Sequence, residues 1–177
     1  MKKLLLLILL GMLSFSSNIV GPRYRLEGSI GGGYAIAKNS TDDHNLTNFD
    51  LAGATLFEYE SKIDDKKSIT FGPKIAVKIG GLFGGNQSVT PSINLGAEID
   101  LNYKVKEDVK LYFGLEAGIG LGVIILLPIV NSGGTGGKFL SGIAKLSVGA
   151  KIKDKYNIGF YGGYGKGNVG IEIGRMF

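Results

Sequence analysis

Residues 93–104 read INLGAEIDLNYK, and their apolar and polar residues alternate. Ile93, Leu95, Ile99, Leu101 and Tyr103 share one parity, while Glu98, Asp100 and Lys104 hold the other. A period of two is typical of a β-strand with two unlike faces. One face of this strand suits lipid or a core, and the other carries full charges.

The same alternation returns along the chain and predicts eight strands. They cover residues 23–37, 48–60, 68–82, 93–104, 110–123, 139–152, 156–164 and 169–177. Short charged turns at 64–67, 106–108 and 153–155 alternate with longer connections at 38–47, 83–92 and 124–138, and 165–168 is a brief hairpin. Short periplasmic turns and long outer loops are usual in outer-membrane barrels, which predicts that both termini are periplasmic.

The charged residues fall almost entirely on one parity of these strands. The apolar parity holds one charge, Arg175. A soluble barrel would place its apolar residues inside, whereas this pattern is the reverse. We therefore expect residues 23–177 to form an all-β domain, an eight-stranded antiparallel up-and-down transmembrane β-barrel. The charged parity comprises Arg23, Arg25, Lys74, Lys78, Lys104, Lys110, Lys145 and Lys151 with Glu27, Asp50, Glu58, Glu60, Glu98, Asp100, Glu116 and Glu172.

The N-terminal residues have the organisation of a secretory signal. Lys2 and Lys3 precede the apolar residues 4–10, and small residues follow at 14–16. We predict a signal peptide over residues 1–16 and export from the cytoplasm. The chain has no cysteine, which excludes a disulfide framework and lipid attachment. The net charge is +5, but the basic residues are scattered among acidic ones and form no cluster, so nucleic-acid binding is not expected.

Aromatic residues gather near the predicted strand ends. Amphipathic rings favour the headgroup level of a bilayer, so this distribution predicts two aromatic girdles. The alternative is that aromatic residues are simply good strand formers. The predicted girdle residues are Tyr24, Tyr34, Tyr59, Phe71, Tyr103, Tyr156 and Tyr164.

The end of the chain carries a family resemblance. Val169, Ile171, Ile173 and Phe177 alternate and finish on an aromatic residue. This pattern resembles the C-terminal signal that the barrel-assembly machinery recognises, although Arg175 departs from it. The barrel segment as a whole resembles the small eight-stranded barrels typified by OmpX and the membrane domain of OmpA. The resemblance implies a Gram-negative outer membrane, contact with its lipid and lipopolysaccharide, and insertion by that machinery.

Charges inside so narrow a barrel must neutralise one another because unpaired buried charge is costly. Two interpretations follow, a salt-bridged plug that fills the lumen and a gate that opens a small ion pathway. The resemblance is compatible with both. We expect Lys74 and Lys78 to face Glu98, Glu116 and Lys145, and Glu172 to lie near Arg25 and Glu27.

Two further motifs invite a catalytic or binding interpretation. Gly165, Gly167 and Gly170 fit a dinucleotide-binding pattern, but a strand follows where that pattern needs a helix, so they are interpreted as turn glycines. His44 lies beside Ser40 and the acids of the first loop, with no rigid strand to position it. We expect no catalytic residue, no metal site and no cofactor, and therefore no enzyme.

The connection 124–138 begins with an apolar run that is too short for a transmembrane helix. It either extends the neighbouring strands above the bilayer or presents an exposed surface to a host or surface protein. The sequence thus favours a structural barrel that interacts through its outer loops. A narrow porin-like channel for ions or small solutes is the alternative.

Overall fold

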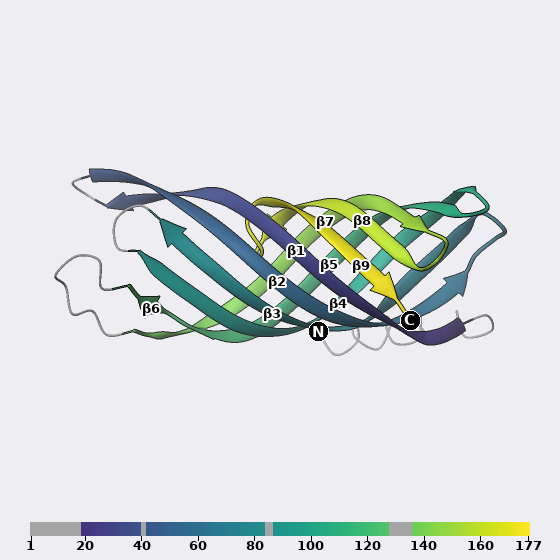
Figure 1. Cartoon of the computed structure of the whole chain (residues 1–177), viewed down its shortest axis with the longest axis horizontal. Coiled ribbons are helices and arrows are strands. Elements are labelled where there is room, and N and C mark those ends of the chain that lie inside the picture. Colours follow the sequence, from purple (N-terminus) through teal and green to yellow (C-terminus); the bar gives the residue numbers. More distant parts are fainter. Residues whose placement is uncertain (1–18, 40–41, 84–86, 128–135) are drawn as a thin grey trace, which may run out of the picture.

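The computed structural model describes residues 19–39, 42–83, 87–127 and 136–177, and the predicted signal peptide lies outside them. Within these ranges no helix has the length and apolarity needed to cross a membrane. The described chain is built from strands and turns (Figure 1). The strands are β1 (Ile19–Asn39), β2 (Asp42–Lys62), β3 (Lys67–Phe83), β4 (Ser88–Lys106), β5 (Val109–Val123), β6 (Ile125–Leu126), β7 (Lys138–Ile152), β8 (Tyr156–Tyr164) and β9 (Val169–Met176).

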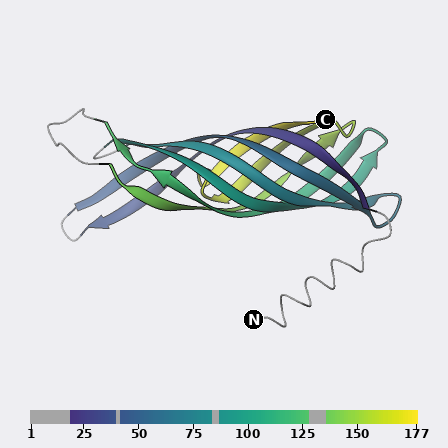
Figure 2. The same ribbon diagram turned by 90° about the horizontal axis from the view of Figure 1, so that it is seen from below.

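Eight of these strands close into a ring of antiparallel pairs. Each long strand pairs with the next, in the order β1-β2-β3-β4-β5-β7-β8-β9. The ring closes where β1 pairs with β9, from Arg25↔Met176 to Gly32↔Val169. The two-residue β6 only extends the pairing of β4. The eight-stranded, all-β antiparallel architecture is confirmed, and Figure 2 shows its tilted strands from below.

The first and last described residues lie at the same end of the barrel, here called the terminal end (Figure 1). The turns 63–66, 107–108 and 153–155 are at this end too. β1, β3 and β5 run toward the opposite, distal end, and the hairpin between β8 and β9 faces the same way from shorter strands. The strands thus follow one another up and down around the ring in the predicted order.

The strands extend further than predicted at the distal end. β1 and β2 remain paired from Gly33↔Asn48 to Asn39↔Asp42, so most of the predicted loop 38–47 is a two-stranded ribbon. β4 begins at Ser88, inside the predicted loop 83–92. Both loop predictions were therefore too long. Polar residues interrupt the two-residue period in these segments, so the sequence pattern does not show the strands. The backbone N–H and C=O groups can still pair across strands, because that pairing does not depend on the side chains.

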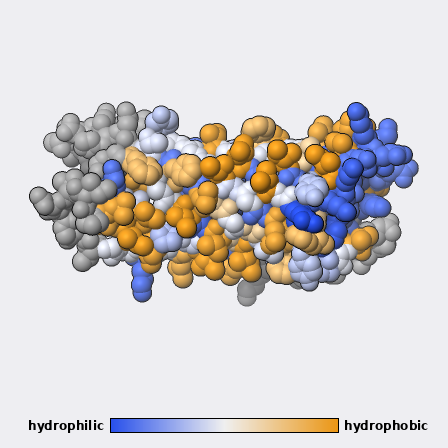
Figure 3. All heavy atoms as spheres, viewed as in Figure 1, coloured by the Kyte–Doolittle hydropathy of each residue, from blue (hydrophilic) through white to orange (hydrophobic). Residues whose placement is uncertain are grey.

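The two faces of the wall are opposite in character. Large apolar side chains cover the outside, as the space-filling view shows over the middle of the barrel (Figure 3). Leu140 and Ile119 are 76% and 71% exposed. Charged side chains fill the inside, where Arg25 and Lys74 are only 1% and 2% exposed. The core of this molecule is polar, and its apolar surface faces outward.

The predicted girdle residues lie on the outer face of the ring. Tyr24, Tyr103 and Tyr156 are exposed toward the terminal end, and Tyr34 and Tyr164 toward the distal end. Tyr59 and Phe71 are half-buried because their rings stack on each other, with centroids 6.0 Å apart. The residues of the predicted assembly signal are also exposed on the outer face, namely Val169, Ile171, Ile173 and Phe177.

Candidate functional site: the charged lumen

The lumen is filled by a cluster of charged side chains that seven different strands contribute. Alternation along each strand points every second residue inward, and the ring brings these residues face to face. We call this set the lumen cluster. Its members are Arg25, Glu27, Glu58, Lys74, Glu98, Asp100, Glu116, Lys145, Lys151, Glu172 and, from a hairpin, Lys166.

Arg25 is the hub of the half nearest the terminal end. Its guanidinium lies 2.8 Å from Glu27 Oε1 and donates to Glu58 Oε2 at 2.8 Å. It also donates to Asp100 Oδ2 at 3.1 Å and to Glu98. One cation thus faces four carboxylates on β1, β2 and β4. The fixed fork of an arginine suits this multiple contact.

Lys151 completes that half from the far wall. Its ammonium donates to Asp100 Oδ2 at 2.8 Å, to Thr70 Oγ1 at 2.8 Å and to Glu58 Oε2 at 3.2 Å. The same ammonium lies 5.5 Å from the centre of the Tyr112 ring. Asp100 and Glu58 therefore each join β7 to β1 across the lumen.

Lys74 is the hub of the half nearest the distal end. Its ammonium contacts Glu27 and Glu98 and lies 3.0 Å from Glu116 Oε2. Lys145 continues the chain of charges, 2.8 Å from Glu116 and in contact with Glu172. Because Glu27 and Glu98 also contact Arg25, the two halves form one connected network.

Tyrosines line the same space. Tyr112 Oη donates to Glu172 Oε1 at 3.0 Å, and the Tyr161 ring lies 5.2 Å from the Lys145 ammonium. These contacts satisfy a carboxylate and a cation that would otherwise have fewer partners. The lumen is thus filled by hydrogen-bonded side chains from opposite walls.

The charges of the described lumen nearly cancel. The lumen cluster holds five cations and six carboxylates, and Arg23 supplies a sixth cation 2.7 Å from Glu58. Removing two charges from water costs several kcal/mol per ion, so such a network need not be a net source of stability. Removing one member is costly, however, because its partners stay buried without their counter-charge.

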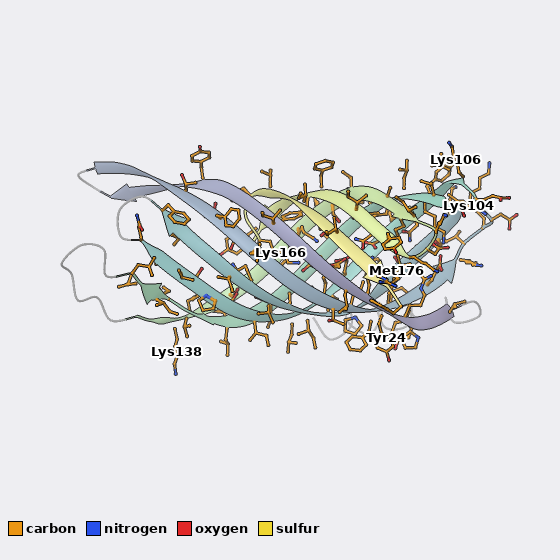
Figure 4. All side chains as sticks on the ribbon, viewed as in Figure 1. Tyr24, Lys104, Lys106, Lys138, Lys166 and Met176 are labelled. Atoms are coloured by element: carbon orange, nitrogen blue, oxygen red, sulfur yellow. The ribbon has the colours of Figure 1, made fainter. Side chains whose placement is uncertain are left out.

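Lys166 enters the lumen from the hairpin 165–168 between β8 and β9. It is 2% exposed, and its ammonium lies 2.9 Å from Glu116 Oε1. Its own carbonyl accepts a hydrogen bond of 2.7 Å from Tyr161 Oη. Figure 4 labels Lys166 within the barrel. β8 and β9 are the shortest walls of the ring, so their hairpin can fold inward instead of projecting from the distal end.

Glycines make room for this inward fold. A Cβ on Gly31 would collide with the Lys166 carbonyl and the Tyr161 hydroxyl. Gly167 has φ of 85°, and a Cβ there would lie 2.6 Å from the Gly32 nitrogen. The turn-glycine interpretation of 165–170 fits these observations, but the inward position of Lys166 was not predicted. The one sequence signal for it is a lysine flanked by two glycines in a very short hairpin.

The predicted network and the observed one differ at two residues. Lys78 does not join Lys74 but lies 3.4 Å from Asp50. The two lysines are four residues apart on one strand, about 13 Å at 3.3 Å per residue, so Lys78 lies in a separate layer nearer the distal end. Glu172 contacts Lys145 and Tyr112, not Arg25 or Glu27, because lumen side chains reach across the barrel. The remaining predicted members, Lys74, Glu98, Glu116, Lys145, Arg25 and Glu27, lie in the lumen cluster.

Two cavities flank the cluster. The distal cavity, about 380 Å³, is lined by Asp50, Lys78 and Tyr164 among others. The terminal cavity, about 570 Å³, is lined by Glu60, Lys110 and the turn 63–66. In that turn the backbone N–H groups of Lys66 and Lys67 donate to Asp64 Oδ1 and hold the pKa of the Asp64 carboxyl below its ordinary value. The cluster separates the two cavities.

The closed ring, the apolar outer face and the charged interior define the class of protein. They are the features of a small eight-stranded transmembrane barrel of the bacterial outer membrane. The structure does not describe the side chains of His44 and its neighbours in the first loop. Residues 128–135 of the third distal connection also lie outside the described ranges.

Three solved structures that are similar to this chain are at most 15% identical to it. Ail, the attachment invasion locus protein of Yersinia pestis, aligns over 89% of this chain and 96% of its own, with 14% identity and a TM-score of 0.43. The outer membrane enzyme PagL aligns over 86% and 95%, with 13% identity and a TM-score of 0.44. Ail in complex with the heparin analogue sucrose octasulfate aligns over 86% and 95%, with 15% identity and a TM-score of 0.36. No protein-family model and no curated protein matches the chain.

Proposed function

We propose that this protein is a non-enzymatic barrel of the outer membrane that interacts with partners through its distal end. Both termini then face the periplasm, and the distal connections face outward. The observation that carries the proposal is the ribbon formed by β1 and β2. It continues to Asn39↔Asp42, seven residues beyond the last pair of β1 with β9 at Gly32↔Val169. The ribbon therefore offers polypeptide above a lumen that the lumen cluster occupies.

The third distal connection supplies a second outward surface. Its described part keeps the strand alternation, with Ile125 and Leu127 exposed and β6 paired to Ser88 and Val89. Exposed apolar side chains at this position suit contact with a host or surface protein, a neighbouring barrel or lipopolysaccharide. During biogenesis, the outer-face alternation of β9 is proposed to serve as the signal for the barrel-assembly machinery.

A surface role predicts that binding depends on the distal connections and not on the turns. Cells that display the protein are expected to adhere to cultured epithelial cells and to bare extracellular-matrix layers. Replacing residues 128–135 by a Gly-Ser linker of equal length should lower adherence to the level of cells without the protein. Asp64→Asn, at the opposite end, is the control and should leave adherence unchanged. Full adherence by the linker variant, with equal surface display, would count against a contact through this connection.

A narrow channel is the second candidate, supported by the cavities that flank the lumen cluster at both ends. If the cluster is a plug, folded protein in a planar bilayer should give no steady openings. Glu116→Ala and Lys145→Ala should then raise conductance by removing charges at its centre. Steady openings of the unaltered protein, shifted by either substitution, would instead favour the channel.

A further inference from the structure

Arg175 is the one charged residue on the lipid-facing parity of β9. Its neighbours on that face are Ile173 and Phe177, and it departs from the apolar pattern that the rest of the strand keeps. Among the described residues no carboxylate lies within ion-pair distance of its guanidinium. This sets it apart from Arg23 and Arg25, whose guanidinium groups each contact carboxylates in the lumen. The positive charge of Arg175 is therefore left for something outside the protein.

Two aromatic rings fix the guanidinium in place. The Arg175 Cζ atom lies 4.9 Å from the centre of the Phe177 ring and 6.0 Å from that of Tyr156. Tyr156 is its direct cross-strand partner on β8, and Leu26 is its partner on β1. Such cation–π contacts orient a cation without neutralising its charge. The guanidinium thus lies beside aromatic rings, and within the described part of the chain no residue accepts a hydrogen bond from it.

The Arg175 guanidinium lies near the terminal end of the barrel, at the level expected for lipid headgroups. Phe177 and Tyr24 exchange backbone hydrogen bonds of 2.8 and 3.3 Å, so Tyr24 belongs to the same patch. Figure 4 labels Tyr24 and Met176 at this end of the wall. Tyrosine rings prefer the interface between hydrocarbon and water, where lipid phosphates also lie. Ile171 and Ile173 continue the patch toward the middle of the apolar band.

We propose that Arg175, with Tyr156 and Phe177, forms a binding site for the phosphate of a phospholipid headgroup. The planar guanidinium binds a phosphate through two parallel hydrogen bonds, which a lysine cannot reproduce. The aromatic rings contact the glycerol and upper acyl chain of the same lipid. The site binds both ends of a phospholipid, because Arg175 contacts the phosphate and the surrounding apolar side chains contact the acyl chain.

The test is lipid retention by the folded protein in detergent micelles, measured by native mass spectrometry during titration with phosphatidylglycerol. Arg175→Gln is expected to weaken retention about tenfold, the loss typical of one charge-assisted pair. Arg175→Lys should recover only part of the affinity. Lys155→Gln, an exposed cation in the adjoining turn, and Lys138→Gln, an exposed cation at the distal end, are the controls and should bind as the unaltered protein does.

Several results would overturn the proposal. One is equal retention by Arg175→Gln and the unaltered protein, with folding of both verified by their mobility on unheated gels. Another is an equal loss in the two lysine controls, which would indicate general charge attraction. Inorganic phosphate is tested as a competitor of the lipid. If it displaced the lipid at equal concentration, the site would recognise a free anion and not a headgroup.

Discussion

Replacing Lys74 with methionine is expected to destabilise the folded barrel by about 3 to 5 kcal/mol, the cost of leaving buried carboxylates without their counter-charge. The ammonium of Lys74 contacts Glu27, Glu98 and Glu116, and all three are buried. Methionine fills a similar volume, so the loss reports on charge more than on packing. The measurement is the guanidinium unfolding midpoint of the protein in detergent micelles, followed by circular dichroism.

Lys67→Met is the matched control for this experiment. Lys67 also pairs with a carboxylate, Asp64, but at 3.9 Å and with its side chain 59% exposed. Exposed pairs contribute at most about 1 kcal/mol, so the midpoint should hardly move. A small effect of Lys74→Met would mean that water enters the lumen and solvates the three carboxylates. That outcome would favour the channel over the plug.

Gly96→Val is expected to block assembly of the ring or to cost about 3 kcal/mol, at the upper end for an overpacked site. Gly96 faces inward and pairs with Gly118 on β5. A Cβ on Gly96 would collide with the Ala117 carbonyl and lie 2.7 Å from the Gly118 Cα. Both obstacles are backbone, which cannot move aside without separating β4 from β5. The measurement is the yield of heat-modifiable, folded protein after refolding into micelles.

Gly28→Val tests whether this loss arises from the collision or from the larger residue itself. Gly28 is exposed on the outer face of β1, and a Cβ there would meet nothing within 4 Å. Valine also has a higher β-strand propensity than glycine, so Gly28→Val should refold as well as the unaltered protein. Equal yields for the two variants would show that β4 and β5 can separate enough to admit the valine side chain.

The division into two faces could be predicted from the sequence because it repeats at a period of two. Glu98 and Asp100 alternate with Ile99 and Leu101, and no other strand register keeps charge out of lipid. Eight such segments then fix the number of strands. The ring itself follows, because an open edge in lipid would leave backbone groups unpaired.

Contacts across the lumen could not be predicted in the same way. They depend on strand tilt and stagger, which decide whether Lys78 meets Glu98 or Asp50. The segment 38–47, most of which pairs as a ribbon, has polar residues at both parities of its sequence and so lacks the signal of alternation. Lys166 lies in a turn, where side-chain direction follows from the backbone conformation and not from parity.

The closure of the ring through β1 and β9 has a consequence for how the chain folds. These strands are the first and the last of the described chain, and they pair from Arg25↔Met176 to Gly32↔Val169. Contacts between residues so far apart in sequence carry a large loop-closure entropy and slow folding. The ion pair of Lys145 with Glu172 also forms only when the last strand is in place. Until its last strand is in place, the chain therefore has an open wall and a Lys145 with one of its two carboxylates missing. Both edges of the sheet are then open to pairing with other chains.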